Sequence, residues 1–186
     1  IGAIVDGRAM ADVLGRDPEA VLDAAVQEDL MLRIDHSCRF PHDRVQEAAY
    51  SLVPERDRPG LHLEIGRRLW ARTPSAERGE RTFEIATQLN HGASLIDSRE
   101  ERESVAEINL SAGKRAKESA AYASALTYLT AGSAFLAEDS WQERYELTFA
   151  LELNRAECEH LCGDSGAAGR RLATLSRRAR TLTDRG

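Results

Sequence analysis

Residues 108–129 read INLSAGKRAKESAAYASALTYL, and this stretch decides the fold class because it joins two helical patterns through a short break. In the first pattern the apolar residues recur every three or four positions and therefore share one helix face; they are Val105, Ile108, Ala112 and Ala116. The second helix carries Leu126, Leu129 and Leu136 among its apolar residues. Alanine and leucine dominate here, and aromatic residues make up only 5% of the chain. This composition predicts closely spaced helical hairpins rather than sheets.

A weak internal repeat supports a stack of such hairpins. Residues 120–129 can be laid over residues 163–172 with a shift of 43 positions. The aligned apolar pairs are Ala125 with Ala168 and Leu129 with Leu172. The pattern resembles the tetratricopeptide repeat, with Gly163–Asp164 at the turn between two helices, although its spacing exceeds the ~34 residues of that repeat. We therefore expect a mainly α protein in which antiparallel helical hairpins form a tetratricopeptide-like α-solenoid.

Further helical patterns extend to both sides of this pair. From residue 57 onward we expect helices and almost nothing else, with a proline-containing linker at Thr73–Gly79 as the expected domain boundary. The helix before the linker has apolar residues spaced by four, namely Leu61, Ile65 and Leu69. The helix after it has apolar residues that step by three and four, namely Phe83, Ala86, Leu89, Ala93 and Ile96.

Two serine–glutamate pairs indicate where later helices begin. Ser98 with Glu101, and Ser140 with Glu143, fit the capping box, in which each side chain satisfies the other's free backbone N–H. The last helical pair is expected to run through Trp141, Tyr145 and Phe149, to break at Gly163–Asp164 and to resume to about Leu182.

The N-terminal part predicts two short helices, a hairpin and a third helix. A helix over residues 8–14 ends at Gly15, and Asp17 with Pro18 begins the next one. The apolar positions of this second helix are Val21, Leu22, Ala25, Val26 and Leu30. LMLRI and CRF, on either side of the polar turn DHS, read as two short strands. Helix–helix–hairpin is the layout of a winged helix. The third helix begins at His42, ends before Pro54 and has Val45, Ala48, Ala49 and Leu52 on one face.

Charge and composition exclude several classes of protein. The net charge of −6 is evenly divided, with 10 basic and 13 acidic side chains in residues 1–72 and 15 and 18 in the remainder. Neither part has the basic excess expected of a DNA-binding domain. No apolar run approaches the ~18 residues of a membrane span, and no signal peptide is evident. Three cysteines fit a reducing, cytoplasmic location. Because the chain starts with Ile1, we interpret it as a piece of a longer polypeptide.

The sequence contains no catalytic, nucleotide or metal motif. Gly113–Lys114, the one Gly-Lys pair, lacks the hydroxyl residue of a phosphate loop and lies in mid-helix. Cys158 and Cys162 share a helix face from which His160 points away, so the three cannot converge on a metal. An arginine-rich stretch near the C-terminus is expected to be an exposed face or a contact with an acidic partner; its members are Arg170, Arg171, Arg177, Arg178 and Arg180.

His42 is the one candidate binding residue. It follows Phe40-Pro41, where a predicted strand gives way to a helix. A histidine at a helix N-terminus can offer its ring N–H, together with free backbone amides, to an anion such as a phosphate. The alternative is that His42 caps its own helix or packs against the hairpin, and spacing alone favours this alternative.

The stretch RFPHDRVQEAAYSLVPERDRPGLHLEIGRRL (39–69) resembles the region that follows the nucleotide-binding core in STAND-type ATPases. The series HDRVQEAAY, HLEIGRRL, FEIATQLNHGASLI, INLSAGKRAKESAAYASALTYL and YELTFALELNRAECEHLCGD is similar to very large bacterial signalling proteins. Those proteins join a serine/threonine-kinase-like domain, an ATPase, a helical-repeat region, a GAF domain and a histidine kinase. The resemblance covers nearly the whole chain.

This resemblance implies that residues 1–72 are the winged-helix-like end of an ATPase module and that residues 75–186 begin the helical-repeat region. In relatives of this ATPase class a winged-helix histidine contacts the β-phosphate of ADP, and His42 matches it through the F-x-H-D pattern. ATP or ADP and Mg are then expected for the parent protein, with no cofactor in this segment. The implied partners are the upstream nucleotide-binding domain, the downstream signalling domains and protein or peptide ligands of the helical-repeat groove, with no nucleic acid.

The expected function is therefore that of a non-catalytic regulatory and interaction segment. Two alternatives stay open at this point. One is a winged-helix transcriptional regulator that binds DNA, but residues 17–30 contain no lysine or arginine. The other is a stand-alone tetratricopeptide-like adaptor that needs no ATPase.

Overall fold

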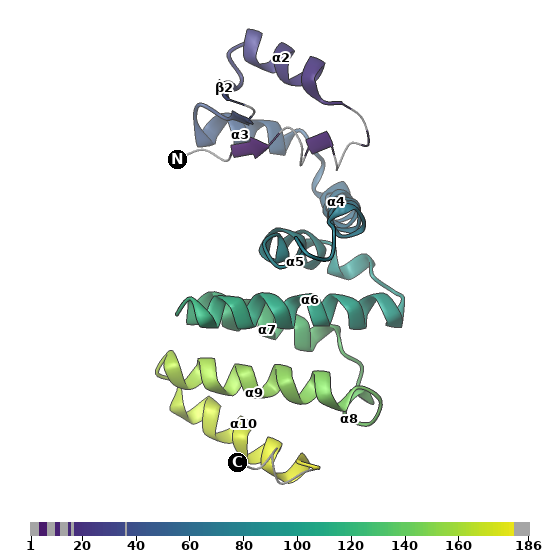
Figure 1. Ribbon diagram of the computed structural model, residues 1–186, viewed down its shortest axis with the longest axis vertical. Coiled ribbons are helices and arrows are strands. Elements are labelled where there is room, and N and C mark those ends of the chain that lie inside the picture. Colours follow the sequence, from purple (N-terminus) through teal and green to yellow (C-terminus); the bar gives the residue numbers. More distant parts are fainter. Residues whose placement is uncertain (1–3, 7–9, 12–14, 16, 36, 181–186) are drawn as a thin grey trace.

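The computed structural model describes residues 4–6, 10–11, 15, 17–35 and 37–180, and within them the protein is mainly helical with one small sheet (Figure 1). The sheet and its helix comprise β1 (Ile4–Asp6), α2 (Glu19–Gln27), β2 (Leu32–Ile34) and β3 (Ser37–Arg39). There follow α3 (Asp43–Ser51), η1 (Glu55–Asp57), α4 (Arg58–Arg72), α5 (Thr82–His91) and η2 (Ala93–Leu95). The chain continues through α6 (Arg99–Glu118), α7 (Tyr122–Phe135), α8 (Ser140–Glu143), α9 (Tyr145–Leu161) and α10 (Ser165–Arg178). No helix in these ranges is long and apolar enough to cross a bilayer.

The N-terminal lobe, which comprises β1, α2, β2, β3 and α3, contains the predicted hairpin, and the structure adds a third strand to this hairpin. β2 and β3 are antiparallel, and β1 pairs antiparallel with the other edge of β3, so that Cys38 lies opposite both Val5 and Arg33. Leu22 of α2 packs with Met31 and with the fully buried Cys38 in a small core. β1 was not predicted, because three residues give too short a pattern to be recognised. The helix predicted over residues 8–14 lies largely outside the described residues.

The predicted apolar face of α3 stays uncovered. No residue of α3 is buried, and Leu52, which follows the helix, is 84% exposed. Val21 and Leu30, predicted on the apolar face of the preceding helix, are each 51% exposed. The lobe therefore buries only a small part of its apolar side chains against itself.

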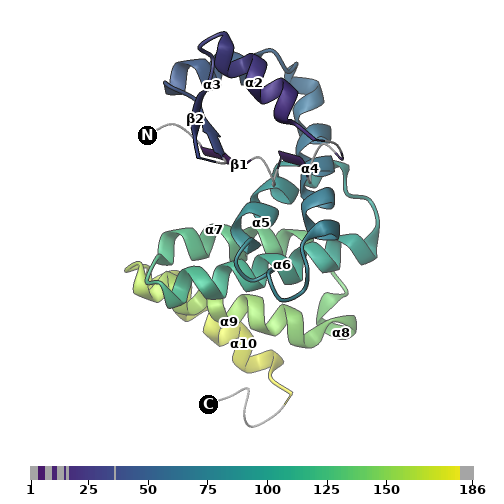
Figure 2. The same ribbon diagram turned by 45° about the horizontal axis from the view of Figure 1, so that its top comes forward.

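The larger part of the chain is a stack of antiparallel helical pairs, as the sequence predicts. α4 packs on α5, α6 on α7 and α9 on α10, and α7 also packs on α9 (Figures 1 and 2). One continuous core runs from α4 to α9. Leu175 of α10 packs with Tyr145 and Phe149 of α9 in a separate cluster. Ala112 is fully buried in it, and Val105, Ile108 and Ala116 are at most 5% exposed, so the predicted inner face of α6 is confirmed. The Thr73–Gly79 linker connects the two helices of the first pair.

Glycine–leucine contacts set the distance between neighbouring helices. A Cβ atom built on Gly113 of α6 would lie 2.5 Å from Cγ of Leu129 on α7. The same kind of contact joins Gly66 to Leu89, Gly92 to Leu63 and Gly132 to Leu151, at 2.6 to 2.8 Å. Real Cβ atoms do not approach carbon so closely, so these helix backbones can meet only where the side chain is absent.

The internal repeat corresponds to equivalent positions in two helical pairs. Ala120, at the turn from α6 to α7, has a φ of +57°, and Gly163, 43 positions later at the turn from α9 to α10, has a φ of +91°. Ala125 and Ala168 are both buried one turn into the following helix. Leu129 is fully buried, whereas the aligned Leu172 is 46% exposed, because no described helix packs beyond α10.

Two local predictions, one of a buried position and one of a helix end, were wrong. In α4 the buried stripe is Leu63, Gly66 and Leu69, and the predicted Leu61 is 40% exposed, because the close approach at Gly66 turns that side of the helix towards α5. The helix predicted through Ile96 ends at His91, before Gly92.

The helix predicted to begin after a cap at Ser140 and to continue through Phe149 is interrupted in the structure. Ser140 lies inside α8 rather than capping it, and the chain bends at Arg144 between α8 and α9.

Two identical substitutions test the spacing constraint. Gly113→Ala should lower the free energy of unfolding by about 1–3 kcal/mol, because the added methyl overpacks against Leu129. Gly169→Ala, in α10, should raise it by about 0.5–1 kcal/mol, because its Cβ meets nothing within 4 Å and alanine favours the helix. Urea unfolding of both variants measures the two changes. Equal changes in the free energy of unfolding of the two variants would show that the glycine–leucine contact does not limit the helix spacing.

Candidate functional site

His42 precedes α3, where the sequence predicts it. Its backbone is extended, with φ −143° and ψ 146°, and its carbonyl accepts a hydrogen bond from the Val45 N–H at 3.0 Å. The ring is exposed and makes no capping hydrogen bond to the first turn of α3. The structure thus does not show the capping alternative. A contact between His42 and nucleotide stays a prediction, because the phosphate would come from another part of the parent protein.

A polar joint connects α3 to the helical stack. The Tyr50 hydroxyl lies 2.9 Å from His62 Nε2, and His62 Nδ1 lies 2.7 Å from Oε1 of Gln88. Because an amide oxygen only accepts, His62 Nδ1 donates to Gln88, and in the neutral ring Nε2 then accepts a hydrogen bond from the Tyr50 hydroxyl. The His91 ring lies beside His62, with centroids 4.7 Å apart, and the Arg58 guanidinium lies over the Tyr50 ring at 4.5 Å. Side chains of α3, α4 and α5 therefore meet at one point.

Within the described residues no shared hydrophobic core reinforces this joint. The core of the lobe and the core of the stack are separate clusters of buried residues. A second link is also polar, since Arg72 of α4 donates to the carbonyl of Ala11 at 3.1 Å. Among the described residues, the contacts between the lobe and the stack named here are hydrogen bonds and ring contacts, and each hydrogen bond is worth only about 0.5–1.5 kcal/mol.

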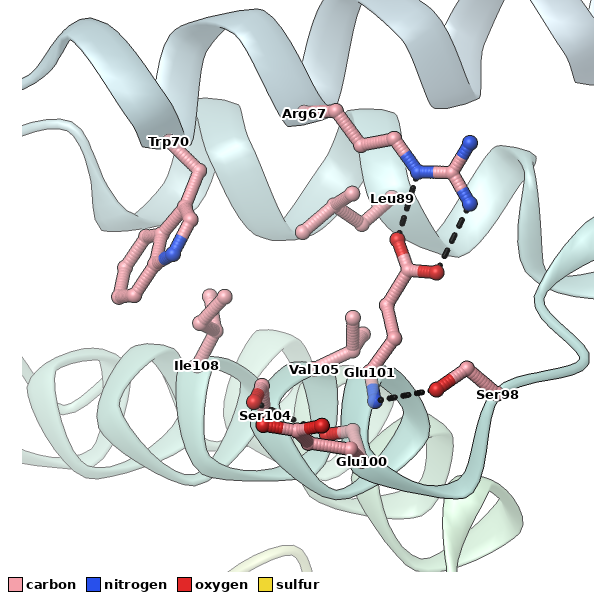
Figure 3. Close-up of a pocket in the computed structure, with 9 residues that line it drawn as sticks. All are labelled: Arg67, Trp70, Leu89, Ser98, Glu100, Glu101, Ser104, Val105 and Ile108. Carbon is pink, nitrogen blue, oxygen red and sulfur yellow. Dashed lines mark hydrogen bonds and ion pairs between the residues drawn. The ribbon is translucent and has the colours of Figure 1, made fainter.

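A hollow of about 280 Å³ opens between α4 and α6 (Figure 3). Trp70 and Arg67 project into it from α4, and the opposite wall is formed by α6. Leu89 of α5 lies between the two helices. The apolar lining residues are Trp70, Leu89, Val105 and Ile108, and the polar ones are Arg67, Ser98, Glu100, Glu101 and Ser104.

An ion pair closes one end of this hollow. Arg67 donates through Nε and Nη2 to the two carboxylate oxygens of Glu101, at 2.6 and 2.8 Å. This hydrogen bonding lowers the pKa of Glu101 and raises that of Arg67. The Ser98 hydroxyl oxygen accepts a hydrogen bond from the Glu101 N–H at 3.4 Å, as the capping box predicts. The Glu101 carboxylate, however, binds Arg67 instead of the Ser98 N–H. Only half of the predicted capping box is therefore formed.

The Trp70 ring forms the other end of the hollow. Its ring is half-buried, and the Arg78 guanidinium lies 4.0 Å from the ring centroid. Arg78 also donates to the carbonyl of Thr73 at 3.2 Å, which fixes the linker against α4. The linker thus holds the indole in place from outside the hollow.

A second hollow, of about 420 Å³, lies along α6, α8 and α9. Arg144 at its edge binds the carboxylates of Glu103 and Glu107 on α6. Glu143 and Glu146 also line it, and no ion pair engages either carboxylate within the described residues.

The remaining sequence candidates do not gather into a site. Cys158 is buried, which raises the pKa of its thiol, whereas Cys162 and His160 are exposed. Across the described ranges no three His, Cys, Asp or Glu side chains could hold a metal ion.

The arginine-rich stretch is largely bound within the protein. Arg171 bonds Glu159 and Glu152, and Arg178 and Arg180 lie over the Trp141 and Tyr145 rings. These contacts attach α10 and its C-terminal end to α8 and α9.

The residues of the hollow and of the joint were not predicted as functional. Arg67 and Glu101 are 34 positions apart, and Tyr50 and Gln88 are 38 apart, so local spacing cannot pair them. The available signals were weak: Trp70 is one of two tryptophans, and Glu101 was singled out only as a capping residue.

Comparison with known proteins gives one distant relative. The chain is similar to the hybrid signal transduction histidine kinase G of Dictyostelium discoideum, with 29% identity over 165 aligned residues that cover 76% of this chain. The chain spans only 5% of that kinase's length. No family model and no solved structure matches the chain. A region of this protein is thus distantly homologous to part of a multidomain signalling kinase.

The Arg67–Glu101 pair predicts a pH-dependent contribution to stability. Because folding lowers the pKa of Glu101, the contribution is present above the unfolded pKa of about 4.3 and is lost as the pH falls through the folded value. Glu101→Gln should therefore lower the free energy of unfolding at pH 7 by up to about 1 kcal/mol, as for other exposed pairs. Urea unfolding at pH 7 and pH 3 should show a smaller difference at pH 3.

The control is Glu100→Gln, one residue away, whose carboxylate has no ion pair within the described residues. Its effect should stay within about 0.5 kcal/mol at both pH values. An undiminished Glu101→Gln effect at pH 3 would show that the ion pair is not its cause.

Proposed function

We propose that this chain is a non-catalytic regulatory and protein-interaction segment of a multidomain signal-transduction ATPase and kinase. Its distant homology to part of a hybrid histidine kinase supports this assignment. The sequence predicts the winged-helix-like end of a STAND-type ATPase module over residues 1–72 and the helical-repeat region over residues 75–186. In the proposal this boundary is moved to the start of α4, because α4 packs on α5, so that α4 to α10 belong to a tetratricopeptide-like region. ATP or ADP and Mg bind in the rest of the parent protein, and the neighbouring domains of the same chain are the direct partners.

We propose that the segment relays the nucleotide state of the ATPase by changing the contact between the lobe and the stack. The observation that supports this relay is the polar joint. A lobe that shared a core with the stack could change its position only by exposing apolar surface. Here the Tyr50–His62–Gln88 chain can break and re-form at the cost of a few hydrogen bonds, each worth about 1 kcal/mol. Two states that differ by such an amount can be shifted by a ligand that binds one of them more tightly.

His42 supplies the link to nucleotide in this proposal. It lies directly before α3, and Tyr50 lies in the last turn of the same helix. A phosphate held by His42 and by the free amides at the start of α3 would therefore fix the position of the helix that ends at the joint. Loss of the phosphate would release α3 and change the contact with His62.

The DNA-binding alternative has little support from the charges of the lobe. Arg33 of β2 is engaged by Glu19 and Asp23 of α2, at 3.1 and 2.5 Å. The helix before the hairpin thus presents carboxylates, which phosphate backbones repel.

The isolated chain should neither hydrolyse ATP nor bind it with micromolar affinity, since no phosphate loop is present in its sequence. Isothermal titration calorimetry with Mg-ATP and a phosphate-release assay measure both properties. A micromolar binding constant would refute the non-catalytic assignment.

Two substitutions in the full-length parent protein test the relay. His42→Ala should speed ADP release and raise basal kinase output, because the resting contact with the β-phosphate is lost. Tyr50→Phe should leave ADP release unchanged but weaken the response of kinase output to nucleotide, because only the Tyr50–His62 hydrogen bond is removed. Stopped-flow release of a fluorescent ADP analogue and autophosphorylation measure the two effects.

The matched control is His160→Ala, an exposed histidine near the end of α9, which should change neither quantity. Unchanged ADP release in His42→Ala would remove His42 from the mechanism. An unchanged nucleotide response in Tyr50→Phe would remove the joint.

A further inference from the structure

We infer that the outer face of α10 binds an acidic amphipathic helix of the parent polypeptide, as the equivalent face of α7 binds α9. The outer face consists of Ser165, Gly169, Leu172 and Ser176, whose spacing of i, i+4, i+7 and i+11 places them on one side of the helix. This inference rests on the proposed role of the neighbouring domains as direct partners, and it names the surface and the chemistry of one such contact.

The internal repeat makes α10 the structural equivalent of α7. The shift of 43 positions carries the end of α6 at Glu118 onto the end of α9 at Leu161. The same shift carries both ends of α7 onto both ends of α10. The pairs α6–α7 and α9–α10 are therefore two copies of one structural unit. What packs on α7 accordingly indicates what can pack on α10.

Helix α7 is covered by α9, which belongs to the next helical pair. Leu129 of α7 is fully buried, and the Ser133 hydroxyl donates to the Glu152 carboxylate of α9 at 2.9 Å. A Cβ atom built on Gly132 of α7 would lie 2.8 Å from Cδ2 of Leu151 on α9. In this contact α9 therefore presents a leucine and the glutamate that follows it to small and apolar residues of α7.

The equivalent positions of α10 are exposed. Leu172, which matches Leu129, is 46% exposed, and Ser176, which matches Ser133, is exposed as well. A Cβ atom built on Gly169 would meet nothing within 4 Å, so there is room beside Leu172 for the side chain of another helix. α10 is the last helix of the stack, and no described helix packs on its outer face (Figure 1). A helix that brings a leucine to this gap would remove Leu172 from water.

The charges of α10 favour an acidic occupant. Arg170 and Arg177, each one position after a residue of the outer face, are exposed, and no ion pair engages either guanidinium in the described part of the chain. The helix that covers α7 is itself acidic, since α9 contains four glutamates and one arginine. Opposite charges favour the approach of such a helix to α10 and disfavour a basic one.

Calorimetry with a copy of α9 tests the inference. The probe is the acetylated and amidated peptide of residues 145–161, with Cys158→Ser to prevent oxidation, added to the whole 186-residue chain. We expect saturable binding with a dissociation constant on the order of 10⁻⁴ M, because the free peptide must be ordered into a helix when it binds. The methyl resonances of Leu172 should shift in step with binding. Binding without this shift would place the peptide elsewhere and would overturn the inference, as would an absence of binding.

Two leucine substitutions separate the outer face of α10 from the rest of the surface. Gly169→Leu fills the gap beside Leu172 and should weaken peptide binding more than about tenfold. Thr127→Leu adds the same side chain at an exposed position of α7 and should change the affinity less than about twofold. Both positions are exposed and leucine favours helices, so both variants should fold, which circular dichroism checks. Equal affinities of the two variants would overturn the inference.

Charge reversals test whether the occupant is acidic. The double variant Arg170→Glu with Arg177→Glu should weaken peptide binding at least about fivefold. The matched control, Lys114→Glu with Arg115→Glu, makes the same change in net charge on α6 and should change the affinity less than about twofold. Equal losses in the two double variants would show that general electrostatics, and not the charge of α10, attracts the peptide.

Altered peptides identify which side chains the outer face recognises. Alanine in place of Leu151, or lysine in place of Glu152, should each weaken binding about tenfold, because these two side chains make the equivalent contact with α7. Unchanged affinity of both altered peptides would contradict the equivalence of α10 with α7.

Two further measurements decide where the occupant comes from. In the parent protein the amides of α10 should exchange hydrogen at least about tenfold more slowly than in the isolated chain, because a helix of the same polypeptide covers them. Equal exchange would overturn the assignment to the parent polypeptide. Sedimentation equilibrium should find the isolated chain monomeric, and a dimer that Gly169→Leu abolishes would assign the face to a second copy instead.

The outcomes for α10 and for the relay are independent. Failure of the α10 tests with an intact effect of His42→Ala in the parent protein would refute this inference alone. Peptide binding to α10 without any effect of His42→Ala would refute the relay alone.

Discussion

The close approach of antiparallel helices through glycine–leucine contacts is the constraint on which the stack depends. At Gly66, Gly92, Gly113 and Gly132 a leucine of the neighbouring helix occupies the space where a Cβ would lie. Such contacts give dense packing with few aromatic residues, because each leucine fills the gap that a glycine leaves. They also fix which side of a helix faces its partner. The buried stripes of α4 and α6 are therefore set by glycine as much as by the larger apolar residues.

The same constraint creates the hollow on one side of the stack. Gly66 draws α4 against α5, and α5 in turn packs on α6, where Asn90 and the fully buried Asn109 exchange two hydrogen bonds of 2.9 Å. α4 and α6 are then separated by the width of α5, and the Arg67–Glu101 pair bridges this gap. The hollow thus results from the packing of α5 against both helices.

The sequence predicted the elements better than the contacts between them. The inner face of α6, the hairpin of the lobe and the turn at Gly163 are confirmed, because each depends on spacing within one segment. On α4 the predicted Leu69 is buried and Ile65 packs against the core, but Leu61 is exposed. Leucine spacing alone ignored Gly66, whose contact with Leu89 decides the orientation of the helix. The site was not predicted because Glu101 can form a capping box locally, and only the fold brings it to Arg67. His42 was found by its place before a helix, and its role is still a prediction.

Helix α4 connects the polar joint to the hollow on the side of the stack. His62, near the start of α4, is hydrogen-bonded to the Tyr50 hydroxyl of the lobe. Arg67 and Trp70, nearer the end of α4, line the hollow. Gly66 lies between them and packs closely against Leu89, so in this proposal α4 and α5 act as one body. A partner that binds one arrangement of lobe and stack more tightly must shift the joint, and a nucleotide that shifts the joint must change the affinity for that partner by the same factor. Signal transmission in this proposal therefore requires only that α4 be rigid and that its contact with the lobe be weak.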